Sequence, residues 1–338
     1  MTEEMKPSES PRALLSFWSL PNDVALNILA RISRIHHPSL SLVSKRFKSI
    51  LSSRELDVTR TLMDKTEKQI YLYLKFRRHT KPCWFALTPG PDQKLKQLPS
   101  FPYEHHPDSP TVVSSGSEIY LIGGLVNHRR SRRVFVLDCR CQKWRKLPEM
   151  RVPRGSYAAA GFIDGKLYVL GGRESSGEVY DPKSGTWEPY MMNIQKDVML
   201  GNFGYFVTNT CFIAEEKILC RVVNHLGSSF LTWCDLGDKM GWRQVKGLEG
   251  LFPVPPDFVS VASPEGGRRL TVWWVSYQKE DDLVLVSEIE IWCAEISFQI
   301  RSREEVYGVV EWSKVLHAMN RSETGGVISL LSSAIVNL

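Results

Sequence analysis

The sequence predicts a small α-helical unit followed by a larger all-β repeat region. Three observations lead to this fold class. Apolar residues recur at helical spacing between residues 20 and 51, short β-rich runs alternate with Gly and Pro turns from residue 70 onwards, and a strand ending in Gly-Gly occurs at both 117–124 and 165–172. With 338 residues, 43% of them hydrophobic and 24% charged, the chain is long enough for two such parts and globular in composition.

The helical unit follows a polar tail at residues 1–13, which we expect to be flexible. Pro21, Asn22 and Asp23 open a first helix, because proline suits the first turn and the polar side chains complement its positive end. We expect His-Pro-Ser at 37–39 to break this helix, and a further helix to end near Leu51. Three short helices bury little apolar surface by themselves, so a unit of this size usually needs a partner.

The stretch from residue 14 to 56 resembles an F-box. Leu20, Pro21 and Asp23 match the opening LP-x-[DE] of the family pattern, and residues 43–50 match its closing V-[SC]-[KR]-x-[WF]-x-x-[LI]. His-His-Pro at 36–38 departs from the Leu-Pro-x-Lys/Arg that the family has at the break. The alternative is an unrelated helical cap whose apolar face packs on the following domain.

The F-box resemblance implies that apolar side chains of this unit dock on a Skp-type adaptor. The residues that it assigns to adaptor binding are Leu20, Pro21, Val24, Ile28, Leu29, Ile32, Leu42, Val43, Phe47 and Ile50. In the isolated chain we expect an exposed apolar patch made by Val24, Ile28, Leu29, Val43, Phe47 and Ile50.

Two copies of one pattern follow in the β-rich region. In each copy a strand ends in Gly-Gly, the next strand ends in Asp, and a Trp follows that Asp by six residues, as in Asp138 to Trp144 and Asp181 to Trp187. The pattern resembles the kelch repeat, a four-stranded blade of a β-propeller. A blade exposes two faces that only neighbouring blades can cover, and we expect the Trp side chains to supply this packing.

The final strand of the repeat recurs at Trp242 and Trp312, and Leu95 stands in the Trp position of the first repeat. We therefore predict an all-β kelch propeller with five recognisable blades, at 70–100, 111–150, 156–192, 205–248 and 257–317; a sixth, as is common in the family, would lie within 191–320. The first blade lacks its innermost strand. We expect the run Val327–Leu331 to supply it, because pairing the end of the chain with its beginning closes the ring and leaves no open edge.

The predicted plan is a tail at 1–13, an F-box at 14–58, a linker at 59–69 and a propeller at 70–338. This combination resembles the large plant family of F-box/kelch-repeat proteins. The family implies a substrate-receptor subunit of a Skp–cullin–F-box (SCF) ubiquitin ligase, which binds the Skp-type adaptor, and through it cullin–RING, with its F-box and a substrate protein with its propeller. Such a subunit acts by proximity and needs no catalytic residue, cofactor or metal.

Two other functions remain open from the sequence. One is a kelch adaptor or scaffold that acts outside a ubiquitin ligase. The other is an enzyme, because some kelch propellers are secreted copper-radical oxidases. An oxidase needs convergent His and Tyr ligands, a cross-linking Cys and export, and the sequence shows neither a ligand set nor a signal peptide.

Arginines gather in the loops that we expect on one face of the propeller. Loops between second and third strands, and loops that join blades, emerge together there, and the family's partner-binding residues usually lie in them. We expect an acidic or phosphorylated substrate segment to bind the arginines Arg129, Arg130, Arg132, Arg133, Arg151 and Arg173. The alternatives are a solvated loop or a nuclear-import signal, and Arg154 has a structural interpretation because the repeat itself commonly has Arg there.

Composition limits the remaining possibilities. Residues 61–150 carry 16 Lys/Arg against 8 Asp/Glu, a locally basic sector that falls short of a nucleic-acid-binding surface. Seven Cys at irregular spacing, with no CxxC pair, indicate reduced thiols, and Cys139 and Cys141 have no second pair to complete a metal site. We expect a cytoplasmic or nuclear protein, or one found in both, with neither nucleic acid nor membrane as a partner.

The sequence also predicts how exposed two pairs of aromatic residues are. His105-His106 lies in a proline-rich loop at 101–110, and we expect it to be exposed. Trp273-Trp274 is a strand pair with one ring on each face. We expect one ring in the core and the other at a surface.

Overall fold

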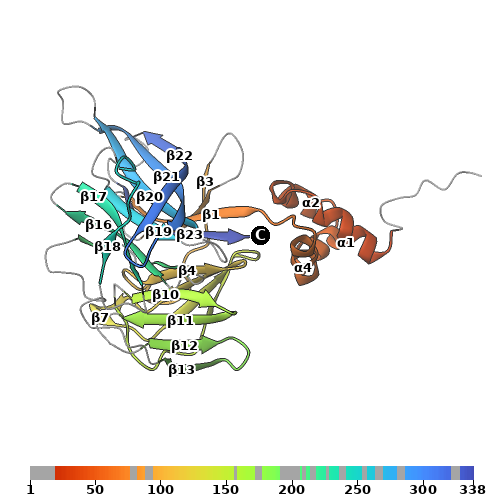
Figure 1. The fold of residues 1–338 in the computed structure, drawn as a ribbon. Coiled ribbons are helices and arrows are strands. Elements are labelled where there is room, and N and C mark those ends of the chain that lie inside the picture. Colours follow the sequence, from red (N-terminus) through yellow and green to blue (C-terminus); the bar gives the residue numbers. More distant parts are fainter. Residues whose placement is uncertain are drawn as a thin grey trace, which may run out of the picture. The chain divides into compact units, whose positions relative to one another are not determined.

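The structure, a computed structural model, describes residues 20–76, 82–87, 94–155, 158–171, 177–190, 206–207, 211–213, 218–225, 228–235, 241–252, 257–262, 269–279, 286–320 and 328–338. The chain divides into two compact units, Met1–Glu67 and Lys68–Leu338. The first unit is helical and the second is built of strands (Figure 1). The expected tail at 1–13 lies outside the described residues.

The helices of the first unit are α1 (Asn22–Ala30), the 3-10 turn η2 (Arg34–His36), α2 (His37–Ser41), α3 (Lys45–Leu51) and α4 (Arg54–Leu62). Serine side chains cap two of them. Ser44 Oγ accepts the backbone N–H of Phe47 at 3.1 Å, and Ser53 Oγ accepts that of Leu56 at 3.3 Å. Each cap satisfies a donor that the first helical turn leaves without an internal partner, and so fixes where α3 and α4 begin.

One prediction about the helical unit is wrong. The first helix ends at Ala30, and the sequence at 37–39 begins α2 instead of breaking a helix, because proline is compatible with a first helical turn. An unexpected helix, α4, crosses the predicted F-box boundary at residue 58 and occupies the first part of the expected linker 59–69. The signal for α4 was present in Ser53 as a cap, followed by Glu55 and Asp57 in the first turn.

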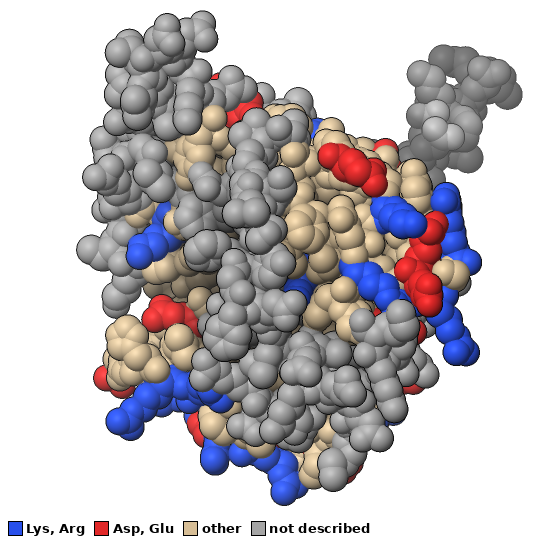
Figure 2. All heavy atoms as spheres, turned by 60° about the vertical axis from the view of Figure 1, so that its left-hand side comes forward, with Lys and Arg blue, Asp and Glu red and all other residues tan. Residues whose placement is uncertain are grey.

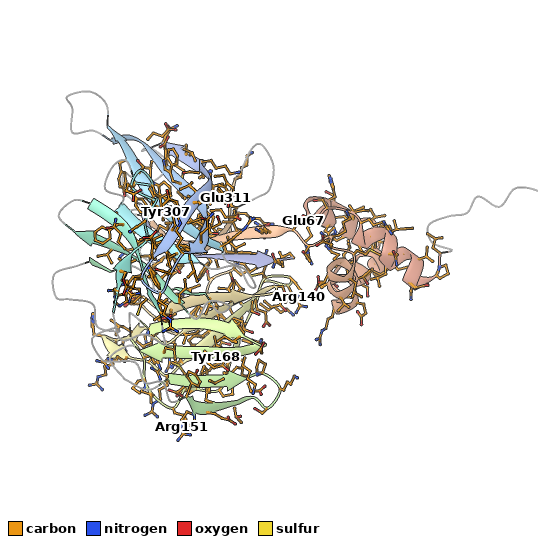
Figure 3. The ribbon with its side chains drawn as sticks, in the orientation of Figure 1. Glu67, Arg140, Arg151, Tyr168, Tyr307 and Glu311 are labelled. Atoms are coloured by element: carbon orange, nitrogen blue, oxygen red, sulfur yellow. The ribbon has the colours of Figure 1, made fainter. Side chains whose placement is uncertain are left out.

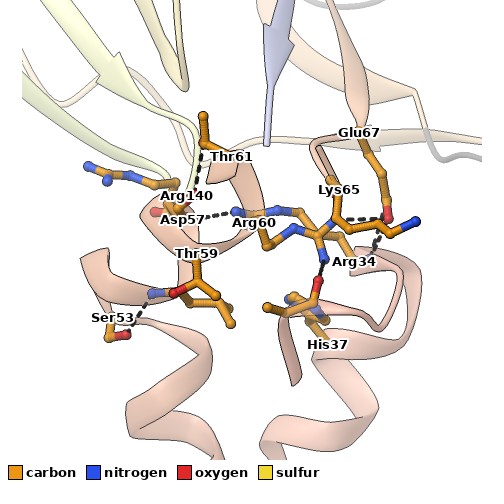
Figure 4. A network of polar contacts seen from close by, with 12 residues as sticks. Arg34, His37, Ser53, Asp57, Thr59, Arg60, Thr61, Lys65, Glu67 and Arg140 are labelled. Atoms are coloured by element: carbon orange, nitrogen blue, oxygen red, sulfur yellow. Dashed lines mark hydrogen bonds and ion pairs between the residues drawn. The ribbon is translucent and has the colours of Figure 1, made fainter. Parts of the chain in front are cut away.

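The buried side chains of the helical unit come from α1, α3 and α4. They are Leu29, Ala30, Phe47 and Leu56. A buried arginine of α4, Arg60, lies beside them and donates hydrogen bonds to the carbonyls of Ala30 at 2.9 Å and Ile32 at 2.7 Å. It also pairs with the Glu67 carboxylate at 3.0 Å (Figure 4). Arg60 therefore satisfies carbonyls at the C-terminal end of α1, which have no partner within the helix.

The strands of the second unit are β1 (Lys68–Phe76), β2 (Cys83–Leu87), β3 (Leu95–Gln97), β4 (Thr111–Ser115), β5 (Glu118–Ile122), β6 (Leu125–Val126), β7 (Arg129–Arg130), β8 (Val134–Asp138), β9 (Lys143–Lys146), β10 (Ala158–Ile163), β11 (Lys166–Gly171), β12 (Gly177–Asp181), β13 (Thr186–Tyr190), β14 (Phe206–Val207), β15 (Cys211–Ile213), β16 (Ile218–His225), β17 (Ser228–Asp235), β18 (Arg243–Gln244), β19 (Asp257–Ala262), β20 (Arg269–Lys279), β21 (Val286–Ile300), β22 (Val306–Asn320) and β23 (Ile328–Asn337).

These strands form the five blades of a propeller. Their strand orders are β23-β1-β2-β3, β4-β5-β8-β9, β10-β11-β12-β13, β15-β16-β17-β18 and β19-β20-β21-β22, and we number them blades 1 to 5. A single parallel bridge between Ala160 and Cys211 links blades 3 and 4, and β6 and β7 form a separate hairpin. The five predicted blades are confirmed, and the described residues contain no sixth four-stranded sheet.

The C-terminal strand closes the ring. β23 pairs antiparallel with β1 from Lys68↔Asn337 to Phe76↔Ile328. Blade 2 also holds it, since Ser114 Oγ donates to the Ile335 carbonyl at 2.6 Å and the Asn337 N–H donates to the Gly116 carbonyl at 2.9 Å. The first blade therefore takes its innermost strand from the end of the chain, which leaves no unpaired edge there.

Tryptophans fill the space between blades in some repeats but not in all. Trp187 is buried between blades 2 and 3, and its Nε1–H donates to the Pro148 carbonyl at 2.9 Å. Trp312 is 38% exposed, because it lies in an exposed stretch of the outer strand β22, and for this residue the expected packing role is wrong. Trp273 and Trp274 are both in the core, one in each cluster beside blade 5, because neighbouring blades cover both of its faces.

Candidate protein-binding surfaces

The helical unit exposes half of the side chains that the F-box resemblance assigned to an adaptor. Pro21, Val24, Ile28, Leu42 and Val43 are exposed. Leu20, Ile32 and Ile50 are half-buried, while Leu29 and Phe47 are buried. The structure thus separates a solvent-facing set at the start of α1 and between α2 and α3 from a set that packs inside the unit.

The expectation of an exposed patch is wrong for Leu29 and Phe47. Both belong to the core cluster, where Leu56 of α4 packs with them. The sequence interpretation had no α4, so it left these two side chains without an internal neighbour. The same helix adds two exposed apolar side chains that the sequence interpretation missed, Val58 and Leu62.

Arg46 of α3 brings the two exposed segments together. Its Nη2 donates to the Leu20 carbonyl at 2.6 Å and to Asn22 Oδ1 at 2.9 Å. Leu42 and Val43 lie just before α3, so Arg46 joins the segment that follows them to the first turn of α1. Exposed apolar side chains of this kind are typical of a surface that binds another protein.

A short arginine-bearing hairpin projects from blade 2. β6 and β7 pair through Leu125↔Arg130 and Val126↔Arg129, and the turn residues Asn127 and His128 have φ of +50° and +61°. Two successive residues with positive φ indicate a type I′ turn, which matches the twist of a tight hairpin. We call residues 125–133 the basic hairpin, because Arg129, Arg130, Arg132 and Arg133 lie in it.

Loops on either side hold the basic hairpin in place. The backbone of Leu125 exchanges two hydrogen bonds of 2.8 Å with Asp108, in the loop between blades 1 and 2. The Arg154 N–H donates to the Ser131 carbonyl at 2.9 Å, from the loop between blades 2 and 3. The inter-strand loop of blade 2 therefore meets two inter-blade loops on one propeller face.

The two glycines after β5 make this close approach possible. Gly123 and Gly124 have φ of +63° and +81°. A Cβ on Gly123 would lie 2.5 Å from the Arg154 carbonyl oxygen, and one on Gly124 would lie 2.8 Å from the Asp108 carbonyl oxygen. Only glycine fits both positions, so the Gly-Gly signature is what lets the neighbouring loops contact the base of the hairpin.

Arg151 lies beside the basic hairpin. The Met150 N–H donates to the Arg132 carbonyl at 2.9 Å, which places the next residue, Arg151, near Arg132. The buried Glu178 carboxylate accepts the backbone N–H groups of Arg151 at 2.7 Å and Val152 at 2.9 Å. Arg151 itself is exposed and lies at the periphery of the propeller (Figure 3).

Arg154 has a structural role. It is fully buried, pairs with Glu178 at 3.2 Å and donates to the Gly171 carbonyl at 2.5 Å. Glu178 therefore holds both the backbone of the loop and a buried cation. Arg173, the sixth expected site residue, lies outside the described residues.

The remaining arginines form a basic area in which few carboxylates of the described residues pair with them. Arg129, Arg132 and Arg151 are exposed and Arg133 is half-buried. None of these four has an ion pair with a described residue. Figure 2 shows Lys and Arg side chains projecting from the lower part of the propeller in that view. Arginines on a rigid hairpin favour a carboxylate or phosphate partner, because the planar guanidinium binds such groups with two parallel hydrogen bonds.

A cavity of about 610 Å³ opens between blades 1 and 2, next to the basic hairpin. Its walls include Tyr73, Phe101, Tyr103 and His106, and Leu125–Asn127 line it on the hairpin side. The expectation that His106 is exposed is wrong: its ring stacks on Tyr73 with centroids 4.6 Å apart, and Nδ1 lies 2.9 Å from the Tyr73 oxygen. Tyr73 comes from β1, 33 positions away, so local sequence gave no signal for this contact.

Within the described residues, no group of three or more His, Cys, Asp and Glu side chains comes together. Cys139 is buried, and burial raises the pKa of its thiol well above the usual range, which disfavours the reactive thiolate. No described helix combines the length and apolar character needed to cross a membrane.

Comparison with known proteins gives matches over both units. The model of the F-box domain matches residues 17–59, and a model described as FKB95, Kelch-repeats domain, matches residues 84–224. Over 346 residues the chain is 44% identical to the F-box/kelch-repeat protein At5g03020 of Arabidopsis thaliana, with 96% of each chain covered. It is 42% identical over 368 residues to the putative F-box/kelch-repeat protein At3g46050 of the same plant, covering 99% of this chain and 97% of that one.

Proposed function

Because the chain belongs to the F-box/kelch-repeat protein family, we propose that it is the substrate-receptor subunit of an SCF-type ubiquitin ligase. F-box domains generally bind Skp-type adaptors. In this proposal the helical unit binds the adaptor, the adaptor links it to cullin–RING, and the propeller binds the substrate protein. The protein works in the cytoplasm, the nucleus or both.

One observation carries the adaptor assignment. The F-box match coincides with a helical unit that leaves Val24, Ile28, Leu42 and Val43 in solvent. Burying such side chains against a partner gains about 25 cal/mol per Å² of apolar surface, and the small unit has no interior left in which to bury them. The adaptor surface therefore comprises the exposed part of the residues that the sequence assigned, and Leu29 and Phe47 support it from within.

The propeller has the complementary task of holding the substrate. Its basic hairpin and Arg151 form the substrate contact, and an acidic or phosphorylated segment is the matching chemistry. The chain contributes no acid, base or nucleophile. Binding raises the local concentration of substrate lysines near the charged ubiquitin-conjugating enzyme, and this proximity accelerates transfer.

Co-purification with a recombinant Skp-type adaptor tests the adaptor assignment. The variant Leu20→Ala with Pro21→Ala should lose adaptor binding and keep its thermal unfolding temperature, because neither side chain belongs to the core of the helical unit. Undiminished recovery of the adaptor with this double variant would refute F-box docking at this surface.

A reconstituted ubiquitination reaction separates the receptor from a scaffold. Full-length protein, adaptor, cullin–RING and conjugating enzyme are combined with a captured substrate. The proposal requires substrate ubiquitination that depends on the adaptor-binding surface. Substrate binding without any ubiquitin transfer, under conditions where a known receptor is active, would favour a scaffold that acts outside the ligase.

A further inference from the structure

The cavity between blades 1 and 2 carries acidic groups at its rim. Asp108 and Glu104 both line it and both are exposed. The Asp108 carboxylate has no ion pair with any described residue. Glu104 lies 3.6 Å from His105 Nε2, which is an ion pair only when that histidine is protonated. Among the described residues that line the cavity, Lys75, also exposed, is the one Lys or Arg, so the carboxylates outnumber the cations in this part of the chain.

His106 adds a hydrogen-bond acceptor to the wall of the cavity. Its Nδ1 lies 2.8 Å from the Pro107 carbonyl oxygen and 2.9 Å from the Tyr73 hydroxyl oxygen, and the tautomer with the hydrogen on Nδ1 donates to that carbonyl. Burial lowers the pKa of His106, which favours the neutral ring, and in this tautomer Nε2 is an acceptor. Nε2 is buried and has no hydrogen-bond partner among the residues that the structure describes. A buried acceptor of this kind needs a donor from a ligand or a water molecule.

Aromatic rings complete the surroundings. Phe101 and Tyr103 are half-buried in the wall and lie edge to face, with ring centroids 5.3 Å apart. Tyr73 stacks between His106 and Trp84 at the base, with its centroid 5.1 Å from that of Trp84. Aromatic faces attract cations through their quadrupole, and carboxylates at the rim add to that attraction.

From these features we infer that the cavity binds an arginine side chain of the substrate protein, next to an acidic segment that lies on the basic hairpin. A guanidinium has five donors and no acceptor, and it is planar enough to stack on a ring, so it suits carboxylates, a bare imidazole nitrogen and aromatic walls together. Leu125–Asn127 belong to both the cavity and the hairpin, so the two sites adjoin. The substrate motif therefore carries both signs of charge within a short distance.

This inference rests on the proposed substrate-binding role of the same face, and the experiment keeps the two apart. Fluorescently labelled peptides with an acidic tract, a short spacer and either arginine or its neutral isostere citrulline are titrated onto the full-length protein in complex with its adaptor. Several spacer lengths are used. We expect the best arginine peptide to bind about tenfold more tightly than its citrulline counterpart.

Three variants assign the effect to the cavity. Asp108→Asn should bring the ratio of the affinities for the arginine and citrulline peptides close to one. It should leave the affinity contributed by the acidic tract unchanged. Lys75→Gln should raise the ratio, because it removes a repelling cation. Arg129→Glu with Arg132→Glu should weaken all acidic peptides equally and keep the ratio.

The outcomes separate the two ideas. A ratio of one in the wild-type protein at every spacer length, or a ratio that Asp108→Asn does not change, overturns the arginine site even if acidic peptides bind. If the wild-type protein still prefers the arginine peptide but the acidic tract adds no affinity, the arginine site is supported. The basic hairpin is then not the contact for the acidic segment.

Discussion

In the helical unit Leu42 is 86% exposed and Leu62 is 83% exposed, whereas the most exposed large apolar side chain among the described residues of the propeller, Ile300, is 43% exposed. The two units differ in how they bury their apolar side chains. Each blade of the propeller covers the next, and β23 closes the ring onto β1. The helical unit has one small core and leaves apolar side chains in solvent.

This difference suits the two partners that we propose for the chain. A closed ring is stable without a partner and can present polar loops, such as the basic hairpin, on a rigid base. The helical unit leaves apolar side chains that a partner protein could cover, which suits the stable adaptor contact that we propose. The comparison predicts that changes in ring closure affect folding, while changes on the helical surface affect assembly.

The largest effect should follow from opening the ring. Deleting residues 328–338 removes β23, which exposes the edge of β1 and the faces of the neighbouring blades. We expect cooperative unfolding of the propeller to be lost, as measured by circular dichroism during heating. A truncated protein that melts at the wild-type temperature would show that the closing strand is dispensable.

Two adjacent leucines of β23 give a matched control. Leu330 is buried and Leu331 is exposed. Leu330→Ala should lower the free energy of unfolding by about 2–5 kcal/mol because it leaves a cavity in the core. Leu331→Ala should change it by less than about 0.5 kcal/mol. Equal effects of the two substitutions would mean that β23 does not pack as described.

The next largest effect should come from the ion pair beside the basic hairpin. Glu178→Ala leaves the fully buried Arg154 without its carboxylate and releases the backbone of Arg151. Breaking such a buried pair costs about 3–5 kcal/mol, which urea denaturation can measure. The control Glu188→Ala, on the exposed position of the next strand, should cost less than about 0.5 kcal/mol.

A substitution in the proposed adaptor contact should have a smaller effect, on the free energy of adaptor binding. Val24 and Val310 are each 38% exposed, one in the helical unit and one on β22 of the propeller. Val24→Glu should weaken adaptor binding about 30-fold, or about 2 kcal/mol, because it places a charge in an apolar interface. Val310→Glu should leave the affinity unchanged. Calorimetric titration with purified adaptor measures both, and equal losses would mean that the adaptor contact is not confined to the helical unit.

The sequence predicted those parts of the fold whose signals are local. A Gly-Gly after a strand, an Asp at the end of the next strand and a Trp six residues later lie within one repeat, and Gly123 and Gly124 show why glycine is required there. Contacts between distant segments were not predictable in this way. The stacking of His106 on Tyr73 and the packing of Leu56 on Phe47 depend on tertiary structure, so the cavity was missed and two core residues were assigned to the surface.

The smallest effect is a pH dependence of propeller stability. Burial lowers the pKa of His106 in the folded state, although Asp108 partly opposes this shift. As pH falls below about 6.5, the unfolded chain takes up a proton at this histidine before the folded protein does, so stability decreases towards acidic pH. The slope from this one group is at most about 1.4 kcal/mol per pH unit. His106→Phe should reduce the difference in unfolding free energy between pH 7 and pH 5.5, and an unchanged difference would show that His106 does not contribute.

We propose that the helical unit and the propeller are separate binding surfaces of one receptor. The decisive test is quantitative mass spectrometry of proteins co-purified from plant cells in which cullin activity is inhibited. Three baits are compared: the wild type, Leu42→Asp with Val43→Asp, and Arg129→Glu with Arg132→Glu. We predict that the first variant loses the Skp-type adaptor and cullin but keeps the substrate, while the second loses the substrate but keeps the adaptor and cullin. If either variant loses the adaptor, cullin and the substrate together, the two surfaces are not separate. If both variants keep all of these partners, neither surface binds as proposed.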